Sequence, residues 1–399
     1  LPSKNVIQSA RVAHLDHHAA AYGVNVERAT ISMAAVRERK RAMVEGMIAI
    51  HEKRFAVPHL EFVLAEGRLV GPRTVEATLP NGGRRRFVAE RLFLNLGTHA
   101  AIPTVPGLAE AAPLTHIEAL ELSHVPAHLI VIGGGYVGVE FAQAFRRLGS
   151  DLADAVRTLF EDDGINVILG ADTKAVEGRS GERVRLSVRT PDGARTIDGS
   201  DILVAAGRTP NTRGVGLESA GIALDERGFI TVDEHLQTTA PGVWALGECA
   251  GSAQFTHVAF DDFRIVRDAW TGTPRSTRDR LIAYCAFIDP ELARVGLDEH
   301  TAKQRGIAVR VARLPMTAVL RARAIGETRG FLKMLIDPES DRILGFTMFG
   351  PNAGEVLAVG GEVPGAALDD QRRAGLVRRH VDRQVGVALA AVDRRRALE

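Results

Sequence analysis

Residues 129–149 read Leu-Ile-Val-Ile-Gly-Gly-Gly-Tyr-Val-Gly-Val-Glu-Phe-Ala-Gln-Ala-Phe-Arg-Arg-Leu-Gly. An apolar strand, a Gly-x-Gly-x-x-Gly turn and an amphipathic helix follow one another in this stretch. Gly133 permits a tight turn, Gly135 lets backbone N–H groups approach a pyrophosphate, and Gly138 lets the helix pack against its strand. The sequence therefore predicts a dinucleotide-binding βα unit, against the alternative of a glycine-rich loop without function.

The residues after this helix depart from the usual dinucleotide fold. Such a fold needs a second strand that ends in an acidic residue about 20 positions beyond the glycines, where it binds the ribose. Residues 151–163 instead have a helical pattern, with Leu152, Val156, Leu159 and Phe160 on one face. We therefore expect the unit to lack its second strand and to resume with a strand at 165–169.

The rest of the chain alternates between helical and β patterns. Residues 5–54 predict helix, and the charged run 37–41 within them predicts a solvated helix face. Residues 60–96 predict a β-hairpin whose return strand runs through Phe87, Val88, Leu92 and Phe93. From about residue 276, mixed β patterns indicate a separate α+β domain. Further short strands are predicted at 184–188, 202–205, 231–232 and 243–246.

Composition excludes several classes of function. The chain has 399 residues, of which 45% are hydrophobic and 25% charged, so it can bury two or three cores. Its formal net charge of +1 gives no reason to expect nucleic acid or an anionic membrane as a partner. We find neither an apolar run of membrane-spanning length nor a signal-peptide pattern, and we expect a cytoplasmic protein. A first residue other than Met suggests that sequence is missing upstream.

Three smaller features have competing interpretations. Cys249 and Cys285 are predicted to be buried free thiols, the alternative being a redox pair that only folding brings together. His14, His17 and His18 have a spacing that could meet a metal, but no acidic or Cys partner accompanies them, so we predict a solvated helix face and no metal site. The arginine-rich tail lacks interleaved aromatic residues, so a poorly ordered or frame-shifted tail is favoured over a nucleic-acid-binding arm.

The order of motifs along the chain resembles the pyridine nucleotide-disulfide oxidoreductases, in particular their mercuric-reductase-like and dihydrolipoamide-dehydrogenase-like members. The resemblance covers residues 1 to about 358. Relative to the family, the chain begins after the first FAD-binding glycine motif and the redox cysteine pair, and it lacks the second nicotinamide-domain strand and a His-Pro-Thr segment. We therefore interpret it as N-terminally truncated and internally deleted. The segments that carry the resemblance are 1–4, 96–98, 102–107, 133–140, 206–211 and 245–248.

The resemblance implies an α/β fold, an incomplete flavoprotein architecture of two dinucleotide-binding domains with a C-terminal α+β dimerisation domain. It implies FAD and NAD(P)H as cofactors and a homodimer. The domains expected are a partial FAD-binding domain without its first βαβ unit (1–108), an NAD(P)-binding domain (109–207), a return segment of the FAD domain (208–275), the α+β interface domain (276–358) and a non-matching tail (359–399).

The resemblance also implies roles for particular residues. Lys4 is expected beside the flavin, paired with Glu140, against the alternative of a frayed terminal lysine. Tyr136 is expected to be an aromatic gate over the flavin, against ordinary packing. Glu248 is expected to accept hydrogen bonds from the flavin ribityl chain, and helix N-capping is a second role that it could fill. The further cofactor-binding residues expected are Gly97, Thr98, Gly133, Gly134, Gly135, Gly138, Gly207, Arg208, Gly247, Thr256 and His257.

The leading hypothesis is an NAD(P)H-dependent flavoprotein oxidoreductase. It would transfer hydride from NAD(P)H through FAD to a disulfide or metal-ion acceptor. A non-catalytic remnant or assembly partner is the first alternative, and a thiol-independent NADH oxidase is the second. Flavin content separates them, because the remnant would be colourless.

Overall fold

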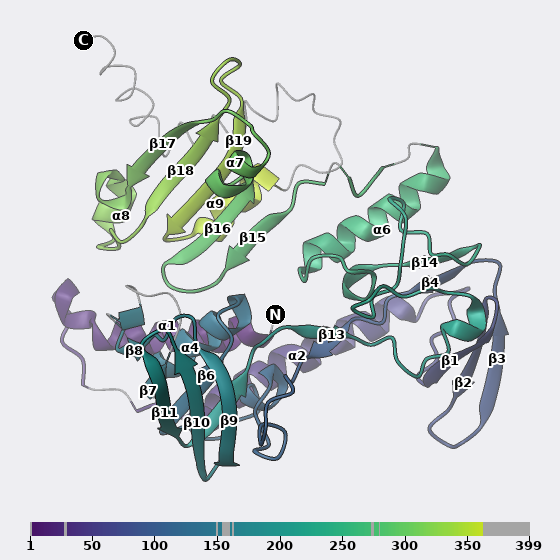
Figure 1. The fold of residues 1–399 in the computed structure, drawn as a ribbon, viewed down its shortest axis with the longest axis horizontal. Helices are drawn as coiled ribbons and strands as arrows, with labels where there is room; N and C mark the ends of the chain where they lie inside the picture. The colour runs from purple at the N-terminus through teal and green to yellow at the C-terminus, as the bar shows by residue number, and fades with distance from the viewer. Residues whose placement is uncertain are drawn as a thin grey trace. The chain divides into compact units, whose positions relative to one another are not determined.

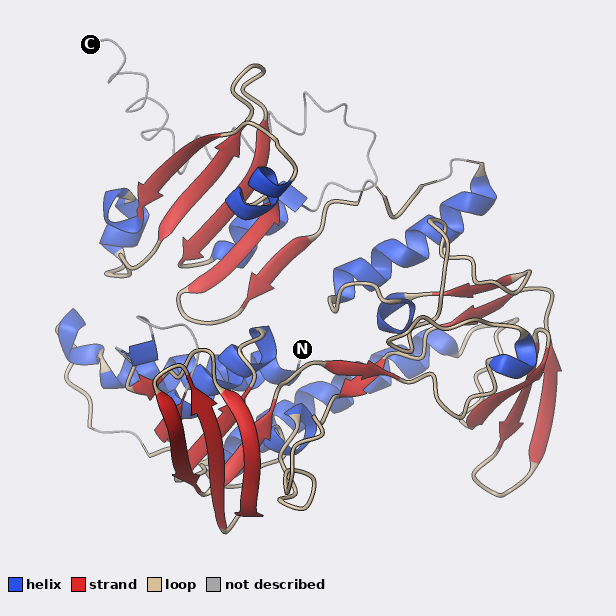
Figure 2. Cartoon of the chain, in the orientation of Figure 1, coloured by secondary structure: helices blue, strands red, loops and turns tan. Residues whose placement is uncertain are grey.

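A computed structural model of the chain describes residues 2–27, 30–148, 151–153, 160–161, 163–272, 275–278 and 280–361. Contacts within the chain divide it into two units. The first comprises Leu1–Val6, Ser32–Gly138 and Ile168–Arg280, and the second comprises Ile7–Ile31, Val139–Val167 and Leu281–Glu399. Two helices, α1 (Pro2–His17) and α4 (Tyr136–Leu148), begin in the first unit and end in the second. Figure 1 labels the elements, and Figure 2 shows which of them are helix and strand.

The predicted strand, turn and helix are confirmed. Strand β6 (His128–Ile132) leads through the glycine turn into α4 (Tyr136–Leu148). It pairs in parallel with β12 (Asp201–Val204), whose four residues are all buried. Parallel strands are usually buried on both faces, which explains why β6 reads as an uninterrupted apolar run.

Two antiparallel sheets of three strands also belong to the first unit. One contains β1 (Glu66–Gly71), β2 (Thr74–Thr78) and β3 (Arg84–Val88). The other contains β9 (Asp172–Arg179), β10 (Arg183–Thr190) and β11 (Gly193–Gly199). Along β10 the apolar side chains are buried and the arginines between them are not, as expected of a sheet with one solvated face.

Short strand pairs join distant segments of the first unit. The predicted hairpin is wrong at its return strand, because β3 ends at Val88 and the next residues form a separate strand, β4 (Leu92–Leu94). Strand β4 pairs in parallel with β14 (Val243–Ala245), so a buried partner far along the chain replaces the hairpin neighbour. In the same way β5 (Thr98–Ala100) pairs antiparallel with β13 (Arg208–Pro210).

The predicted helix over 5–54 is two helices with a break. After α1, a short 3₁₀ helix, η1 (Ala19–Tyr22), ends at Gly23, which is left-handed with φ 73°. Helix α2 (Met33–Phe55) starts anew with the Ser32 side chain as its N-cap. The charged run is also not wholly solvated, since Lys40 is buried and pairs with Glu121.

The remaining helices of the first unit are short apart from one. They are α3 (His116–Ala119), which carries a capping box, the 3₁₀ helices η2 (Glu218–Ala220) and η3 (Gly247–Ala250), and α6 (Thr256–Thr271). A core of apolar residues from β1, β4, β14 and η2, including Leu69, Leu94, Leu217 and Val243, holds β4 and β14 in place.

The second unit contains the predicted α+β domain. Five antiparallel strands lie in the order β15-β16-β19-β18-β17. Their apolar faces share a core with α8 and α9. The elements are β15 (Ala283–Ala286), β16 (Glu291–Gly296), α7 (Glu299–Gln304), β17 (Arg310–Pro315), η4 (Met316–Ala318), α8 (Leu320–Ala324), β18 (Phe331–Ile336), β19 (Ile343–Gly350) and α9 (Ala353–Gly361).

The segment after α4 differs from its prediction. Residues 151–153 form a strand, β7 (Asp151–Ala153), where the sequence predicted helix, so the expectation that no second strand follows α4 is wrong. It pairs in parallel with β8 (Ile165–Asn166), which is shorter than the strand predicted at 165–169. The helix predicted around Val156 and Leu159 lies outside the described residues, as does Asp162. No helix in the described part of the chain is long and apolar enough to cross a membrane.

Candidate functional site

The glycine turn has the geometry that a dinucleotide site requires. Gly133 is left-handed at φ 117°, and a Cβ there would lie 2.3 Å from the carbonyl oxygen of Ala205. A Cβ at Gly138 would lie 2.0 Å from the carbonyl oxygen of Gly133, so the first turn of α4 packs directly on the glycine turn. These two glycines are required by the protein's own backbone.

Gly135 differs from its two neighbours. It is not left-handed, and apart from its own chain neighbours no heavy atom of the described protein lies within 4 Å of the position that its Cβ would take. The chain's own packing therefore does not require glycine at this position. Open space beside the first N–H groups of a helix is what a phosphate needs for close approach, so the residues present fit a pyrophosphate.

The first residues of α4 and α6 lie together. The Tyr136 hydroxyl donates to Gln254 Oε1 at 2.9 Å, and its ring lies 5.6 Å from that of Phe255, the N-cap residue of α6. Thr256 and His257 follow as exposed residues of the first turn, and the His257 ring stacks on Phe255. The structure therefore brings Tyr136, the first residue of α4, near the start of α6, where two other predicted site residues lie.

Three predicted site residues from three elements form one polar cluster. The Thr98 hydroxyl donates to Glu248 Oε2, and Arg208 Nε lies 2.5 Å from Thr98 Oγ1 and 3.0 Å from Glu248 Oε2. Arg208 also donates to the Thr98 carbonyl at 2.7 Å. These side chains are only partly exposed, at 19% for Arg208 and 29% for Glu248. The guanidinium thus compensates the carboxylate while leaving part of it accessible.

The charge of Arg208 in this cluster affects the pKa of His116. Burial, and after it the Arg208 guanidinium, lower the pKa of the His116 imidazole below its ordinary value. The neutral ring therefore predominates at pH 7.

Backbone bonds hold the crossing at Gly97. Gly97 is left-handed at φ 64°, and its carbonyl accepts from Asn211 N. The Asn211 side chain donates to the Leu96 carbonyl at 2.9 Å, and Gly207 accepts from Ala101 N at 3.0 Å. Segments 96–101 and 207–211 therefore support each other, which explains why both belong to the motif set noted in the sequence.

The sequence did not predict a second layer behind Gly247. Gly247 is left-handed at φ 69°, and its N–H donates to Asp262 Oδ2 at 2.7 Å. Asp262 is fully buried on α6, and its other oxygen accepts from Arg280 Nη2 at 2.5 Å. A buried Asp in an amphipathic helix is the one available signal, since Asp262 falls where an apolar residue is expected.

No disulfide joins Cys249 and Cys285, as predicted. Cys249 is fully buried and its sulfur contacts the backbone of β4 and η3, accepting from Leu96 N at 3.4 Å. Burial raises the pKa of this thiol, which makes it a poor nucleophile. Cys285 is half-buried on β15, so the prediction that both thiols are buried is wrong for this one.

Lys4 and Glu140 fall in different units. Lys4 is half-buried in the first turn of α1. Glu140 is buried on α4, and its Oε1 accepts from Phe287 N at 2.9 Å. The Lys4–Glu140 pair therefore stays a prediction, as do the individual roles of the cofactor-binding residues.

Known proteins match almost the whole described chain. Residues 2–262 match the family model of pyridine nucleotide-disulphide oxidoreductases, and residues 282–362 match the dimerisation domain of that family. The probable pyridine nucleotide-disulfide oxidoreductase RclA of Escherichia coli is 34% identical over 76% of this chain and 72% of its own length. A mercuric reductase of Streptomyces lividans is 30% identical over 90% of this chain and 79% of its own length.

A solved structure shows the same fold. The Cu(II) complex of the HOCl-induced flavoprotein disulfide reductase RclA from Escherichia coli has a TM-score of 0.79 and 26% identity, covering 94% of this chain and 88% of that one. The predicted α/β flavoprotein fold with a C-terminal dimerisation domain is confirmed, and the dimerisation domain supports a homodimer. Proteins of this kind contain FAD and use NAD(P)H. The chain belongs to the pyridine nucleotide-disulfide oxidoreductase family.

Proposed function

We propose that this chain is an FAD-dependent oxidoreductase that takes hydride from NAD(P)H and passes the electrons to a disulfide or a metal ion. Two observations in the first unit carry the proposal. The open space at Gly135 and the Thr98–Arg208–Glu248 cluster supply the first unit with a phosphate-binding turn and a charge-compensated carboxylate. A nicotinamide dinucleotide and a flavin need these two features.

Each of these residues has a distinct task in the proposed reaction. The N–H groups at 133–137 bind the dinucleotide phosphates, and Tyr136 covers the position that the nicotinamide takes. Glu248 accepts hydrogen bonds from flavin hydroxyls, and Arg208 pairs with its carboxylate and orients it. The flavin itself supplies the hydride and electron chemistry when bound.

Related proteins support a metal-ion acceptor. One relative is a mercuric reductase, and the similar solved structure is a Cu(II) complex. The same solved protein is a disulfide reductase, so a disulfide is the other acceptor. A thiol-independent NAD(P)H oxidase is a second candidate function. The burial of Cys249 and the raised pKa of its thiol favour it, because they leave this cysteine unsuited to exchange.

The test is cofactor content followed by turnover. The purified protein is examined for flavin absorbance, then mixed with NADH or NADPH and with Hg²⁺, Cu²⁺, a small aromatic disulfide or oxygen alone. We expect flavin and acceptor-dependent NAD(P)H oxidation, unchanged in Cys249→Ala and reduced in Glu248→Gln. A colourless protein without turnover would contradict the proposal and favour the non-catalytic alternative. Turnover with oxygen alone would favour the oxidase.

A further inference from the structure

Helix α4 carries three buried polar residues on one side. Glu140 and Gln143 are 3% and 4% exposed, and the side chain of Arg147 is 7% exposed. Their spacing of three and four residues places them along a single helical stripe. Buried polar groups are stable where their hydrogen bonds are satisfied, so this stripe requires a polar partner.

The partner is the backbone of residues 287–289. Phe287 N donates to Glu140 Oε1 at 2.9 Å, and Asp289 N donates to Gln143 Oε1 at 2.6 Å. Gln143 Nε2 returns a bond to the Asp289 carbonyl at 2.9 Å. These residues connect β15 to β16, the first two strands of the dimerisation domain. Side chains of the helix stripe therefore make hydrogen bonds to this backbone that a neighbouring strand would make in a sheet.

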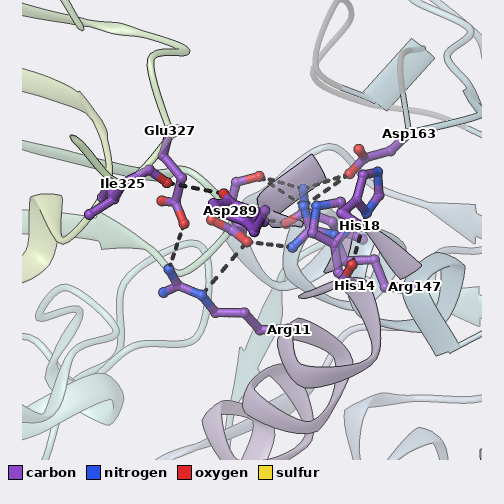
Figure 3. A network of polar contacts seen from close by, with 10 residues as sticks. Arg11, His14, His18, Arg147, Asp163, Asp289, Ile325 and Glu327 are labelled. Carbon is purple, nitrogen blue, oxygen red and sulfur yellow. Dashed lines mark hydrogen bonds and ion pairs between the residues drawn. The ribbon is translucent and has the colours of Figure 1, made fainter. Parts of the chain in front are cut away.

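Charged groups reinforce this contact. Arg147 Nη1 donates to Asp289 Oδ2 at 2.6 Å, and Arg147 Nη2 lies 3.4 Å from Asp163 Oδ2. Arg11 of α1 lies 3.9 Å from the same Asp289 oxygen and pairs with Glu327 at 3.2 Å. Figure 3 shows Arg11 and Arg147 beside Asp289, with Glu327 beside Arg11. Removal of one member leaves another partly buried charge without compensation, so the network stabilises the seated arrangement of residues 287–289.

The same helix begins at the glycine turn. Glu140 stands four residues after Tyr136, one helical turn from the N–H groups that the proposed function assigns to phosphate. A helix of 13 residues is marginal without tertiary contacts, and helix formation is cooperative along its length. A ligand at its start and a seated 287–289 segment on its stripe therefore order the same element. Each lowers the cost of ordering it for the other.

We propose that dinucleotide binding at the glycine turn and seating of residues 287–289 on the Glu140–Gln143–Arg147 stripe are coupled through α4. NAD(P)H then binds more tightly when the segment is seated, and bound NAD(P)H strengthens the homodimer by ordering the start of its dimerisation domain. The inference rests on the proposed function only in that the turn binds a dinucleotide. Gln143 is a positioning residue in this scheme, since it acts through α4 and not on the ligand.

The first experiment measures NADH affinity by isothermal titration in the parent and in Gln143→Leu. Gln304→Leu is the matched control, because Gln304 is an exposed helical glutamine in the same unit. We expect Gln143→Leu to weaken NADH binding at least threefold and Gln304→Leu to leave it unchanged. Equal affinity in all three proteins would overturn the coupling while the proposed function stands. A parent that binds no NADH would overturn the proposed function, and the coupling with it.

The second experiment does not depend on the folding of the Gln143 variant. Sedimentation of the parent with and without NADH gives the dimer dissociation constant in each state. Coupling between binding sites is reciprocal. NADH should therefore lower the dimer dissociation constant to the extent that it binds more tightly to the dimer than to the monomer. Gly135→Val should abolish the effect, since a branched side chain fills the open space where phosphate approaches. A parent that binds NADH without any change in dimer affinity would refute the inference.

Discussion

The glycines of the turn meet different surroundings, and we expect alanine substitution to separate a structural glycine from a ligand-binding one. In Gly138→Ala the new Cβ would lie 2.0 Å from the Gly133 carbonyl oxygen, where ordinary contacts begin at 3.4 Å. The backbone at Gly133 or at the start of α4 must then move by more than 1 Å to relieve this contact. Overpacking of this kind costs about 3 kcal/mol, and the better helix propensity of alanine returns up to about 1 kcal/mol. The net expectation is a loss of about 2 kcal/mol.

Gly135→Ala should have the opposite effect on stability. Apart from its chain neighbours, no heavy atom of the described protein lies within 4 Å of its Cβ position, and its φ is not left-handed, so alanine fits without strain. The lower entropy of the unfolded chain then stabilises the protein by about 0.5 kcal/mol. The methyl group nevertheless occupies space reserved for phosphate, so NADH binding should weaken although the fold is intact.

Urea unfolding and isothermal titration together decide this prediction. Unfolding midpoints of the two variants should move to opposite sides of the parent, and only Gly135→Ala should combine full stability with weakened NADH binding. If Gly135→Ala is as unstable as Gly138→Ala, the space at Gly135 serves the fold and not a ligand. If it binds NADH as well as the parent does, the assignment of the turn is wrong.

Three further predictions concern single side chains. Arg208→Met removes the cation beside Glu248 and should cost about 1 to 3 kcal/mol in urea unfolding. Adding Glu248→Gln should recover most of that loss, and an additive loss would contradict the pairing. Burial lowers the pKa of His14 from 6.5 to about 4. Between these two pH values the unfolded chain binds a proton that the folded chain does not, so the free energy of unfolding decreases as the pH is lowered. His14→Gln should therefore gain about 1 kcal/mol over the parent between pH 7.5 and pH 4.5, after allowance for solvent screening, and parallel pH profiles would refute this. Thiol titration of the folded protein should modify half-buried Cys285 before Cys249, and the reverse order would contradict the burial of Cys249.

Local patterns sufficed for the glycine turn. Each feature that identifies it lies within about 20 residues, and Gly138 is explained by a contact inside the same βα unit, whereas Gly133 is required by the carbonyl of Ala205, which follows β12. The five-stranded domain was also predicted in kind, because alternating strands such as β18 carry their burial pattern in sequence. The helix break at Gly23 was missed because the apolar pattern on either side is continuous, whereas a left-handed glycine stops the helix.

Long-range pairing set the limit of prediction elsewhere. Leu92 and Phe93 follow a hairpin strand closely enough to be assigned to it, yet their partner is β14, about 150 residues away. The cluster at Glu248 has the same character, since its three members come from β5, β13 and η3. Motif resemblance named all three residues, but their mutual hydrogen bonds depend on strand pairing that no local pattern encodes.

The polar stripe on α4 shows why a residue's role is not fixed by the motif that contains it. Resemblance assigned Glu140 to the flavin side, and no motif assigned a role to Gln143 or Arg147. Burial of all three is favourable because backbone N–H groups at 287 and 289 donate to Glu140 and Gln143 and the Asp289 carboxylate accepts from Arg147, and these partners belong to the dimerisation domain. Polar residues that interrupt no apolar pattern and match no ligand motif are therefore the positions where domain contacts should be sought.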